Sequence, residues 1–237
     1  MRKFLMGAIA VSAILAVAVP AVAQTPESTF KSSVLPRNAG TTNKPANTAF
    51  RIDLTLNKPG TTVEFIDLKL PKTLKLSGKG LNSCTVQDLE FDPASCNDAK
   101  AGPPGRATAA QGPPATAVPI SFAVQPYVRD ANTLLFFVVG QGGLAVQSPI
   151  TAKLTNKGRN LRLQIPEELR RPGGTDASLT GLTQTFKAKK GKNYLVSSSG
   201  CKNKKHPITG VLTFTQRIDA LPVPGPVTTK ANAKCSK

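Results

Sequence analysis

The sequence predicts an all-β protein, an antiparallel β-sandwich of about nine or ten short strands with extended tails at both ends. Three observations lead to this fold class. Apolar and polar residues alternate with a period of two in several short segments. The 20 prolines and 19 glycines divide these segments from one another. No long segment carries the apolar period of 3.6 residues that an amphipathic helix requires.

The first 23 residues have the pattern of a cleavable signal peptide. Arg2 and Lys3 precede an uncharged apolar stretch from residue 4 to residue 19, and Pro20 interrupts it. The small-x-small sequence Ala21-Val22-Ala23 follows, which is typical of a signal peptidase site. An uncleaved membrane anchor is the alternative, because the stretch is just long enough to span a bilayer. We expect cleavage, no membrane span afterwards, and a secreted or extracytoplasmic protein.

Residues 24–45 contain few large apolar side chains, and we expect an extended N-terminal lead-in there. The sandwich domain is expected to cover residues 46–218. Its first strand runs from Phe50 to Leu56, where apolar and polar residues alternate. A turn at residues 57–60 leads to a second strand over 61–70. The alternation there moves from Val63 and Phe65 to Ile66, which indicates a β-bulge.

The middle of the chain predicts two hairpins. Residues 99–119 are loop-like and proline-rich, with one short strand near 106–110. The alternating segment 120–124 and the apolar run 134–139 form the first hairpin through residues 129–132. The run 134–139 has no polar residue, so we expect it to be buried on both faces. The segments 150–154 and 161–165 form the second hairpin, with Gly158 in its turn.

The rest of the domain is predicted to add strands near 181–188, 193–197 and 208–218. One helical turn is expected at 167–171, after Pro166. Residues 219–237 form a basic, proline-containing C-terminal tail.

The four cysteines predict two disulfide bonds. An even number of cysteines in an exported chain favours disulfides, and four cysteines allow three pairings. Closeness in sequence favours Cys84 with Cys96 and Cys201 with Cys235, and the second bond would close the tail. A metal site is the alternative. It usually has paired Cys-x-x-Cys or Cys/His spacing, which is absent here, so we predict no metal and no cofactor.

The chain is strongly basic, with a formal net charge of +18 from 31 Lys+Arg and 13 Asp+Glu. Such a charge attracts anions, such as wall polymers or anionic headgroups. Solvated turns that keep the protein soluble are the alternative. Nucleic acid is not expected, because the protein is exported and the basic region lacks interleaved aromatic residues. The predicted anion-binding residues are the densest cluster of lysines: Lys187, Lys189, Lys190, Lys192, Lys202, Lys204 and Lys205.

No catalytic constellation is visible. The single histidine, His206, lies between Lys205 and Pro207, and we expect it in a surface turn without a partner. The chain has no Gly-x-Ser-x-Gly elbow, P-loop or dinucleotide fingerprint. Asp88, Glu90 and Asp92 alternate, so on a strand they would share a face. They would then form either a calcium site or a solvated edge.

Several segments together resemble a group of uncharacterised secreted proteins of high-GC Gram-positive bacteria. The order is Val34-Leu35-Pro36-Arg37-Asn38-Ala39-Gly40, Leu68-Lys69-Leu70-Pro71-Lys72, Cys84 to Cys96, Gly200-Cys201, Thr213-Phe214-Thr215 and Cys235. The resemblance covers most of the chain after the signal peptide. It implies an extracytoplasmic β-sandwich with two local disulfides, and no activity. Asn97 departs from the pattern, which has proline after the second cysteine.

Together these features predict an exported, non-catalytic protein of the cell envelope or extracellular space. We expect it to bind an anionic envelope polymer or another envelope protein through its basic C-terminal region. Two alternatives stay open. One is a secreted hydrolase with dispersed carboxylates, although the absence of Trp and the presence of only two Tyr argue against a sugar site. The other is a structural or calcium-dependent adhesion module.

Overall fold

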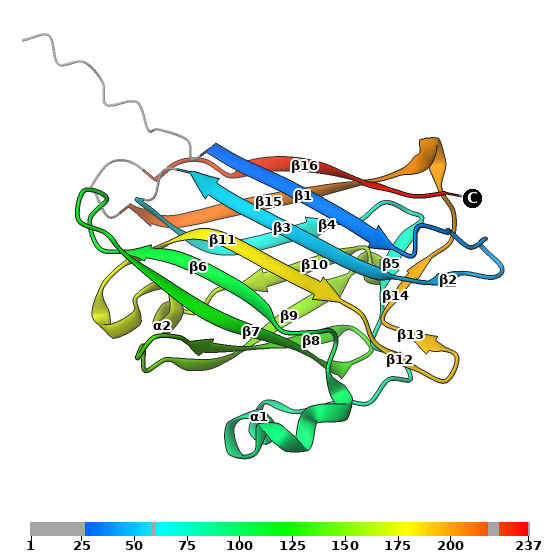
Figure 1. Ribbon diagram of the computed structural model, residues 1–237, viewed down its shortest axis with the longest axis horizontal. Helices are drawn as coiled ribbons and strands as arrows, with labels where there is room; N and C mark the ends of the chain where they lie inside the picture. Colours follow the sequence, from blue (N-terminus) through cyan, green and yellow to red (C-terminus); the bar gives the residue numbers. More distant parts are fainter. Residues whose placement is uncertain (1–26, 58–59, 218–222, 237) are drawn as a thin grey trace, which may run out of the picture.

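One antiparallel sheet of eleven strands dominates the computed structural model, which describes residues 27–57, 60–217 and 223–236 (Figure 1). The sheet curls until its two edge strands lie side by side, so it is nearly closed. In spatial order its strands are β1 (Glu27–Leu35), β3 (Ala49–Asn57), β11 (Ala177–Phe186), β6 (Gly105–Gln111), β7 (Val118–Asp130), β8 (Thr133–Gly140), β9 (Gln147–Thr155), β10 (Asn160–Gln164), β4 (Thr61–Lys69), β15 (Lys205–Arg217) and β16 (Val227–Lys234).

The remaining elements are short and cover the ends and one side of the curl. A three-stranded sheet contains β2 (Ala46–Asn47), β14 (Val196–Ser198) and β5 (Leu74–Leu76), and a hairpin contains β12 (Lys189–Lys190) and β13 (Asn193–Tyr194). The helices are α1 (Val86–Phe91) and α2 (Glu167–Arg170). The 3-10 segments are η1 (Pro93–Ala99), η2 (Asn156–Gly158), η3 (Pro172–Gly174) and η4 (Lys202–Lys204).

The prediction of a mostly antiparallel β protein with few helices is confirmed. The finer prediction of a sandwich of nine or ten strands is not confirmed, because the main sheet alone has eleven strands. Just beyond the two edge strands, two backbone hydrogen bonds join the segments that follow β1 and β16. Ser236 N donates to the carbonyl oxygen of Arg37, and Ala39 N donates to that of Ser236, each at 2.9 Å.

Strands form at both ends of the described chain, where the sequence indicates a lead-in and a tail. β1 buries only Phe30 and Val34, and β16 buries Val227, Thr229, Ala231 and Ala233. These inward side chains are few or small, so the apolar alternation is weak there. The pairing of β1 with β3 and of β16 with β15 nevertheless completes the sheet. The predicted signal peptide, residues 1–23, lies outside the described residues.

The core lies inside the curl, where inward side chains from the strands meet. Phe50, Phe136 and Phe186 form its aromatic centre, with ring centroids 5.8 Å apart for Phe50 and Phe186 and 6.0 Å for Phe136 and Phe186. The predicted bulge in β4 is confirmed. Val63 and Ile66 both point inward, and Phe65 points outward beneath the guanidinium of Arg162, 4.3 Å from its ring centroid.

The apolar run of β8 is buried on both faces, as predicted. Leu134, Phe136 and Val138 belong to the main core, whereas Leu135 and Phe137 face the opposite way. On that outer side, Leu89 of α1 and the Cys84–Cys96 disulfide form a second, smaller core with them. The α1–η1 segment therefore covers the outside of β7 and β8 (Figure 1).

Both predicted disulfides are present, Cys84–Cys96 and Cys201–Cys235. The second bond joins the start of η4 to the end of β16. Within the described ranges, no helix is long and apolar enough to cross a membrane. The two disulfides are consistent with an extracellular protein.

Candidate functional site: a pocket lined by lysines

A polar pocket of about 240 Å³ lies between the β12–β13 hairpin and the end of η1. Three lysines line it. Lys189 and Lys190 come from β12 and belong to the predicted cluster, whereas Lys100 follows η1 and was not predicted. Asp98 and Asn82 supply the other polar side chains of the lining. The pocket therefore combines three cations with one carboxylate, a formal charge of +2.

The hairpin holds its two lysines in place through local contacts. Gly191 adopts a positive φ of 58°, which glycine accepts without strain, and so permits the tight turn between β12 and β13. Lys190 Nζ donates a hydrogen bond to Asn82 Oδ1 across the pocket. The ammonium of Lys189 lies 5.9 Å from the ring centroid of Tyr194, within reach of a weak cation–π attraction. Both ammonium groups are thus positioned rather than freely extended into solvent.

The opposite wall is fixed by the first disulfide and by backbone pairing. Cys96 and Ala99 of η1 are buried in the smaller core, so the residue that follows them is held at the surface. Ala101 N donates to the carbonyl oxygen of Pro126 at 2.8 Å, and Lys187 N donates to that of Ala101 at 2.7 Å. Lys100 is therefore clamped between β7 and the end of β11.

The seven predicted lysines are all exposed, and they divide into two groups. Lys187 and Lys192 lie next to or within the hairpin, but they do not line the pocket. Lys202, Lys204 and Lys205 lie at η4 and the start of β15. Lys205 pairs in register with Lys234 of β16. The structure thus brings two members of the cluster together in the pocket and places three beside β16.

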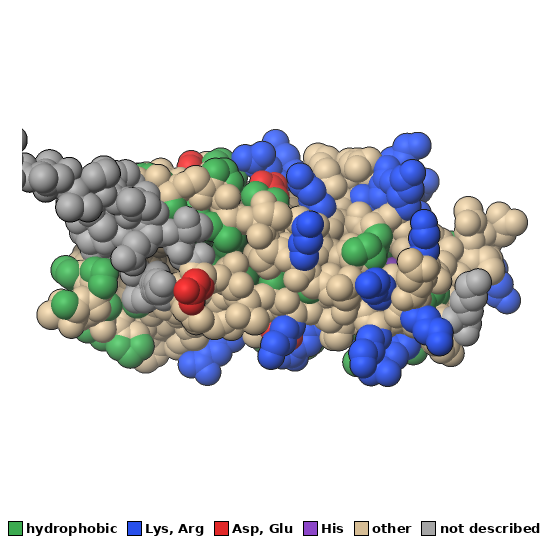
Figure 2. Space-filling model, turned by 90° about the horizontal axis from the view of Figure 1, so that it is seen from above, with side chains coloured by type: hydrophobic (Ala, Val, Ile, Leu, Met, Phe, Trp, Pro, Cys, Tyr) green, Lys and Arg blue, Asp and Glu red, His purple; other side chains and the backbone are tan. Residues whose placement is uncertain are grey.

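The upper side of the molecule in Figure 1 is also basic. The strands there, β1, β15 and β16, carry exposed Lys31, Lys205, Lys230 and Lys234. Figure 2 shows that Lys and Arg side chains gather on the half of this face nearer the C-terminal end, where few acidic side chains are visible. The edge strands therefore carry a second basic area besides the lysine pocket.

The prediction that His206 lies in a surface turn is wrong, because its side chain is fully buried. His206 belongs to β15, and it shares the inward phase of Ile208 and Leu212. Its Nδ1 lies 3.0 Å from Thr73 Oγ1, and its Nε2 lies 3.4 Å from Ser198 Oγ. Burial lowers the pKa of His206 below its usual 6.5. Ser198 is also buried, so this pair has no access to a substrate.

Asp88, Glu90 and Asp92 do not lie on a strand, because residues 86–91 form helix α1. Asp88 closes a capping box with Thr85: its Oδ2 accepts from Thr85 N at 3.0 Å, and its own N donates to Thr85 Oγ1 at 3.1 Å. The hydrogen bonds that this carboxylate accepts from Thr85 N and, at 2.8 Å, from Thr85 Oγ1 lower the pKa of Asp88. Asp92 Oδ1 caps η1 by accepting from Ala94 N at 3.1 Å. Two of the three acids thus cap the N-terminal ends of helical segments, Asp88 for α1 and Asp92 for η1.

Cys84, Asp88 and Cys96 lie within 4.8 Å of one another, the one group of potential metal ligands in the described ranges. The two sulfurs are bonded to each other. A cysteine binds a metal ion as a free thiolate, and neither cysteine has one while the disulfide is intact. The group is therefore not a cysteine metal site in this form of the protein.

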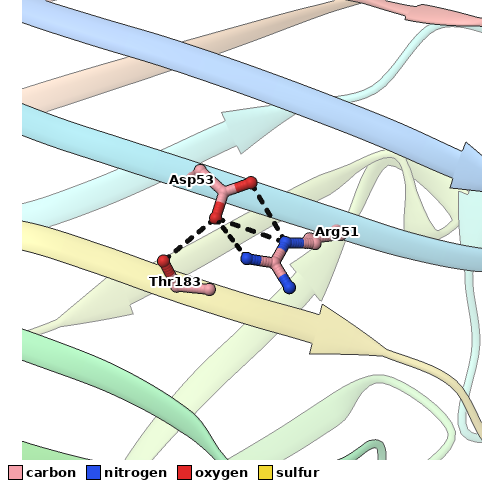
Figure 3. A network of polar contacts seen from close by, with 3 residues as sticks. All are labelled: Arg51, Asp53 and Thr183. Atoms are coloured by element: carbon pink, nitrogen blue, oxygen red, sulfur yellow. Dashed lines mark hydrogen bonds and ion pairs between the residues drawn. The ribbon is translucent and has the colours of Figure 1, made fainter.

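Other carboxylates take part in surface networks. Asp53 accepts hydrogen bonds from Arg51 and from Thr183 Oγ1, which lies 3.0 Å away on the neighbouring strand (Figure 3). The hydrogen bond from Arg51 is the main cause of the lowered pKa of Asp53. This network lies on the outer face of β3 and β11 and supports their register. The lysine pocket holds one carboxylate, and a second, apolar cavity inside the curl holds none.

No protein-family model matches the chain, and no curated protein matches it.

Proposed function

We propose that this is a non-catalytic protein of the cell envelope or extracellular space, which binds an anionic envelope polymer in the lysine pocket. The observation that carries the proposal is the meeting of Lys100, Lys189 and Lys190 on one pocket of about 240 Å³. A phosphate or carboxylate group of the polymer would accept hydrogen bonds from these ammonium groups.

The remaining basic surface supports a polymer rather than a small anion. Exposed lysines of β15 and β16 form a second basic area, on the face seen in Figure 2. A chain that carries many negative charges interacts with such a field over several repeats, and each contact is weak when solvated. The pocket then supplies the positioned contact, and the surrounding lysines supply long-range attraction.

The disulfides support the proposed compartment. Bonds such as Cys84–Cys96 and Cys201–Cys235 persist outside the reducing cytoplasm. They also fix the pocket wall and the end of β16, both of which carry lysines used in the proposal.

The test compares two double variants that remove equal charge. The first variant, Lys189→Gln with Lys190→Gln, removes both positive charges from the hairpin side of the pocket. The second, Lys230→Gln with Lys234→Gln, removes two exposed lysines from β16. Binding to polyphosphate and to polygalacturonate is measured by titration calorimetry, with neutral dextran as the control polymer. If each lysine contributes roughly 0.5–1 kcal/mol to the free energy of binding, the pocket variant should bind about tenfold more weakly.

The β16 variant is expected to lose no more than about threefold, because its lysines contribute only diffuse attraction. Equal losses in the two variants would show that net charge alone drives binding, and the pocket would then have no special role. Binding of dextran with the same affinity as the charged polymers would overturn the proposal as a whole.

A further inference from the structure

A narrow apolar cavity of about 90 Å³ lies inside the curl of the large sheet. Its walls are inward side chains of the sheet strands, together with α2 at one end. Of all its lining residues, only Arg170 and Gln184 are polar. The interior is therefore not completely filled by its own side chains, and an apolar molecule would find an apolar surface there.

The shape of the cavity matches a chain rather than a ring. Its lining follows β11 from Ala177 through Leu182 to Phe186. At roughly 3.3 Å per residue this stretch of strand is about 30 Å long. A single water molecule needs about 10–15 Å³ of cavity volume. A volume of 90 Å³ that follows the strand is therefore narrow, only a few atoms wide. One unbranched hydrocarbon chain fits these proportions.

One end of the cavity lies beside α2, where the charged lining residue Arg170 is found. The lining residues there, Ile165, Leu169 and Arg170, are only half-buried. Toward the far end of β11 the lining includes Phe136 and Phe186, which are fully enclosed in the aromatic centre of the core. A chain would thus enter next to α2 and end near these rings.

Arg170 is the cation available at this end of the cavity. Its Nε donates to the carbonyl oxygen of Ile165 at 3.1 Å, which holds the guanidinium against the rim. Its two Nη atoms have no partner in the described part of the chain. The neighbouring charges are engaged: Arg171 pairs with Asp176 at 3.0 Å and with Glu167 at 3.8 Å. Glu168 Oε1 accepts from Ser148 Oγ at 2.9 Å.

We propose that the cavity binds a free, unbranched fatty acid, with the alkyl chain inside the sheet and the carboxylate on Arg170. The guanidinium fork suits a carboxylate, which accepts two parallel hydrogen bonds from it. Gln184 limits the depth. Its Nε2 donates to the carbonyl oxygens of Pro103 and Thr185, and its buried Oε1 accepts no hydrogen bond within the described residues. Methylene groups that contact this oxygen contribute less binding free energy than those that contact only apolar side chains.

The first experiment measures the affinity of the delipidated protein for decanoate, tetradecanoate and hexadecanoate by calorimetry. Each pair of methylenes is expected to tighten binding by up to about tenfold until the chain reaches Gln184, after which affinity levels off. The methyl ester of each acid is expected to bind about tenfold more weakly, because it lacks the carboxylate charge.

Variants separate the cavity from the basic surface. Arg170→Met should weaken fatty acid binding about tenfold and leave binding of the methyl ester unchanged, while Arg171→Met, at the residue that follows α2, serves as the matched control. Ala107→Leu adds a side chain to the cavity lining and should abolish binding of both ligands. Its thermal unfolding is measured as well, and a melting temperature no lower than that of the parent shows that the fold is intact.

Absence of saturable binding by the folded parent protein would overturn the proposal. So would binding that survives in folded Ala107→Leu, because the ligand would then lie elsewhere. Equal losses for Arg170→Met and Arg171→Met would remove the role of Arg170. Tighter binding of a lysophospholipid than of the fatty acid with the same chain would contradict the assignment of a free carboxylate.

Discussion

The buried histidine illustrates how one residue couples this fold to pH. His206 is enclosed by Thr73 before β5, Ser198 of β14 and the facing residue Ala233 of β16. Its two ring nitrogens contact hydroxyl groups, which accommodate the neutral ring in either tautomer. The neutral form is therefore the one that the folded protein favours, in agreement with the lowered pKa.

This arrangement predicts a loss of stability at mildly acidic pH. The unfolded chain takes up a proton on His206 near pH 6.5, whereas the folded protein resists protonation until a lower pH. The contribution is complete above pH 6.5 and is lost as the pH falls below it, at no more than about 1.4 kcal/mol per pH unit. Urea unfolding between pH 7.5 and pH 5 measures this slope.

His206→Gln keeps a side chain that can hydrogen-bond to both hydroxyl groups, and it is expected to flatten the slope. The lowered pKa of Asp53 does not interfere, since its contribution is lost only in more acidic solution, below about pH 4. An unchanged slope in the His206→Gln protein would show that another group causes the pH dependence.

Among the elements, the two disulfide-linked segments have different roles. Cys84–Cys96 closes a loop with a sequence separation of 12 and anchors the wall that carries Lys100. Cys201–Cys235 spans a separation of 34 and fixes the last strand of the sheet. In the chain-entropy model, these loops correspond to about 3 and about 4 kcal/mol of stability, respectively.

Replacement of each pair by alanine should therefore separate stability from binding. The Cys201→Ala/Cys235→Ala protein is expected to lose at least as much stability as the Cys84→Ala/Cys96→Ala protein. Its affinity for polyphosphate should be unchanged under conditions in which it is folded. The Cys84→Ala/Cys96→Ala protein should bind more weakly as well, since its pocket wall is loosened. Denaturant unfolding and calorimetry on the same samples decide between these outcomes. Equal affinities would mean that the disulfide does not shape the pocket.

The sequence predicts elements well where alternation is strong. The strands around Phe50–Leu56, the β4 bulge and the hairpin turn at Gly158 are all present, and Gly158 has a φ of 79°. Helix α1 was not predicted, because the alternation of its acidic residues is typical of a strand. The capping box of Thr85 and Asp88 is the local signal that indicates a helix there. The period-two phase of β15 could have identified His206 as an inward residue, had the strand been extended to Lys205.

The functional surfaces were harder to predict, because they join distant parts of the chain. Lys100 is far in sequence from Lys189 and Lys190, and only the fold brings them to one pocket. The apolar cavity likewise leaves no local signal. Its lining residues alternate as any buried strand does, and the space between them depends on how far the sheet curls.

At the scale of the whole molecule, the two proposed sites lie at opposite ends of the sheet. Helix α2, which borders the apolar cavity, lies at one end, and the β12–β13 hairpin, which carries Lys189 and Lys190, lies at the other (Figure 1). The first site depends on burial of apolar surface, and the second depends on solvated charges. Salt should therefore affect the two unequally.

Raising NaCl from 0.05 to 0.5 M shortens the range of electrostatic interaction to a few ångströms. We expect polyphosphate binding to weaken at least tenfold, whereas tetradecanoate binding should change by less than about threefold, since its main contribution is hydrophobic. Parallel titrations of one protein preparation measure both. A loss of fatty acid affinity as steep as that of the polymer would mean that the lipid adheres to the basic surface.

The meeting of β1 with β16 also determines when the fold can be completed. A nascent chain exposes β1 well before β16, the strand that lies beside it in the fold. Until residues 227–236 arrive, β1 and β15 both present open edges, and such edges are prone to pair with other chains. Closure of the sheet therefore waits until residues 227–236 have been synthesised, which favours a chain that stays unfolded until that strand is available.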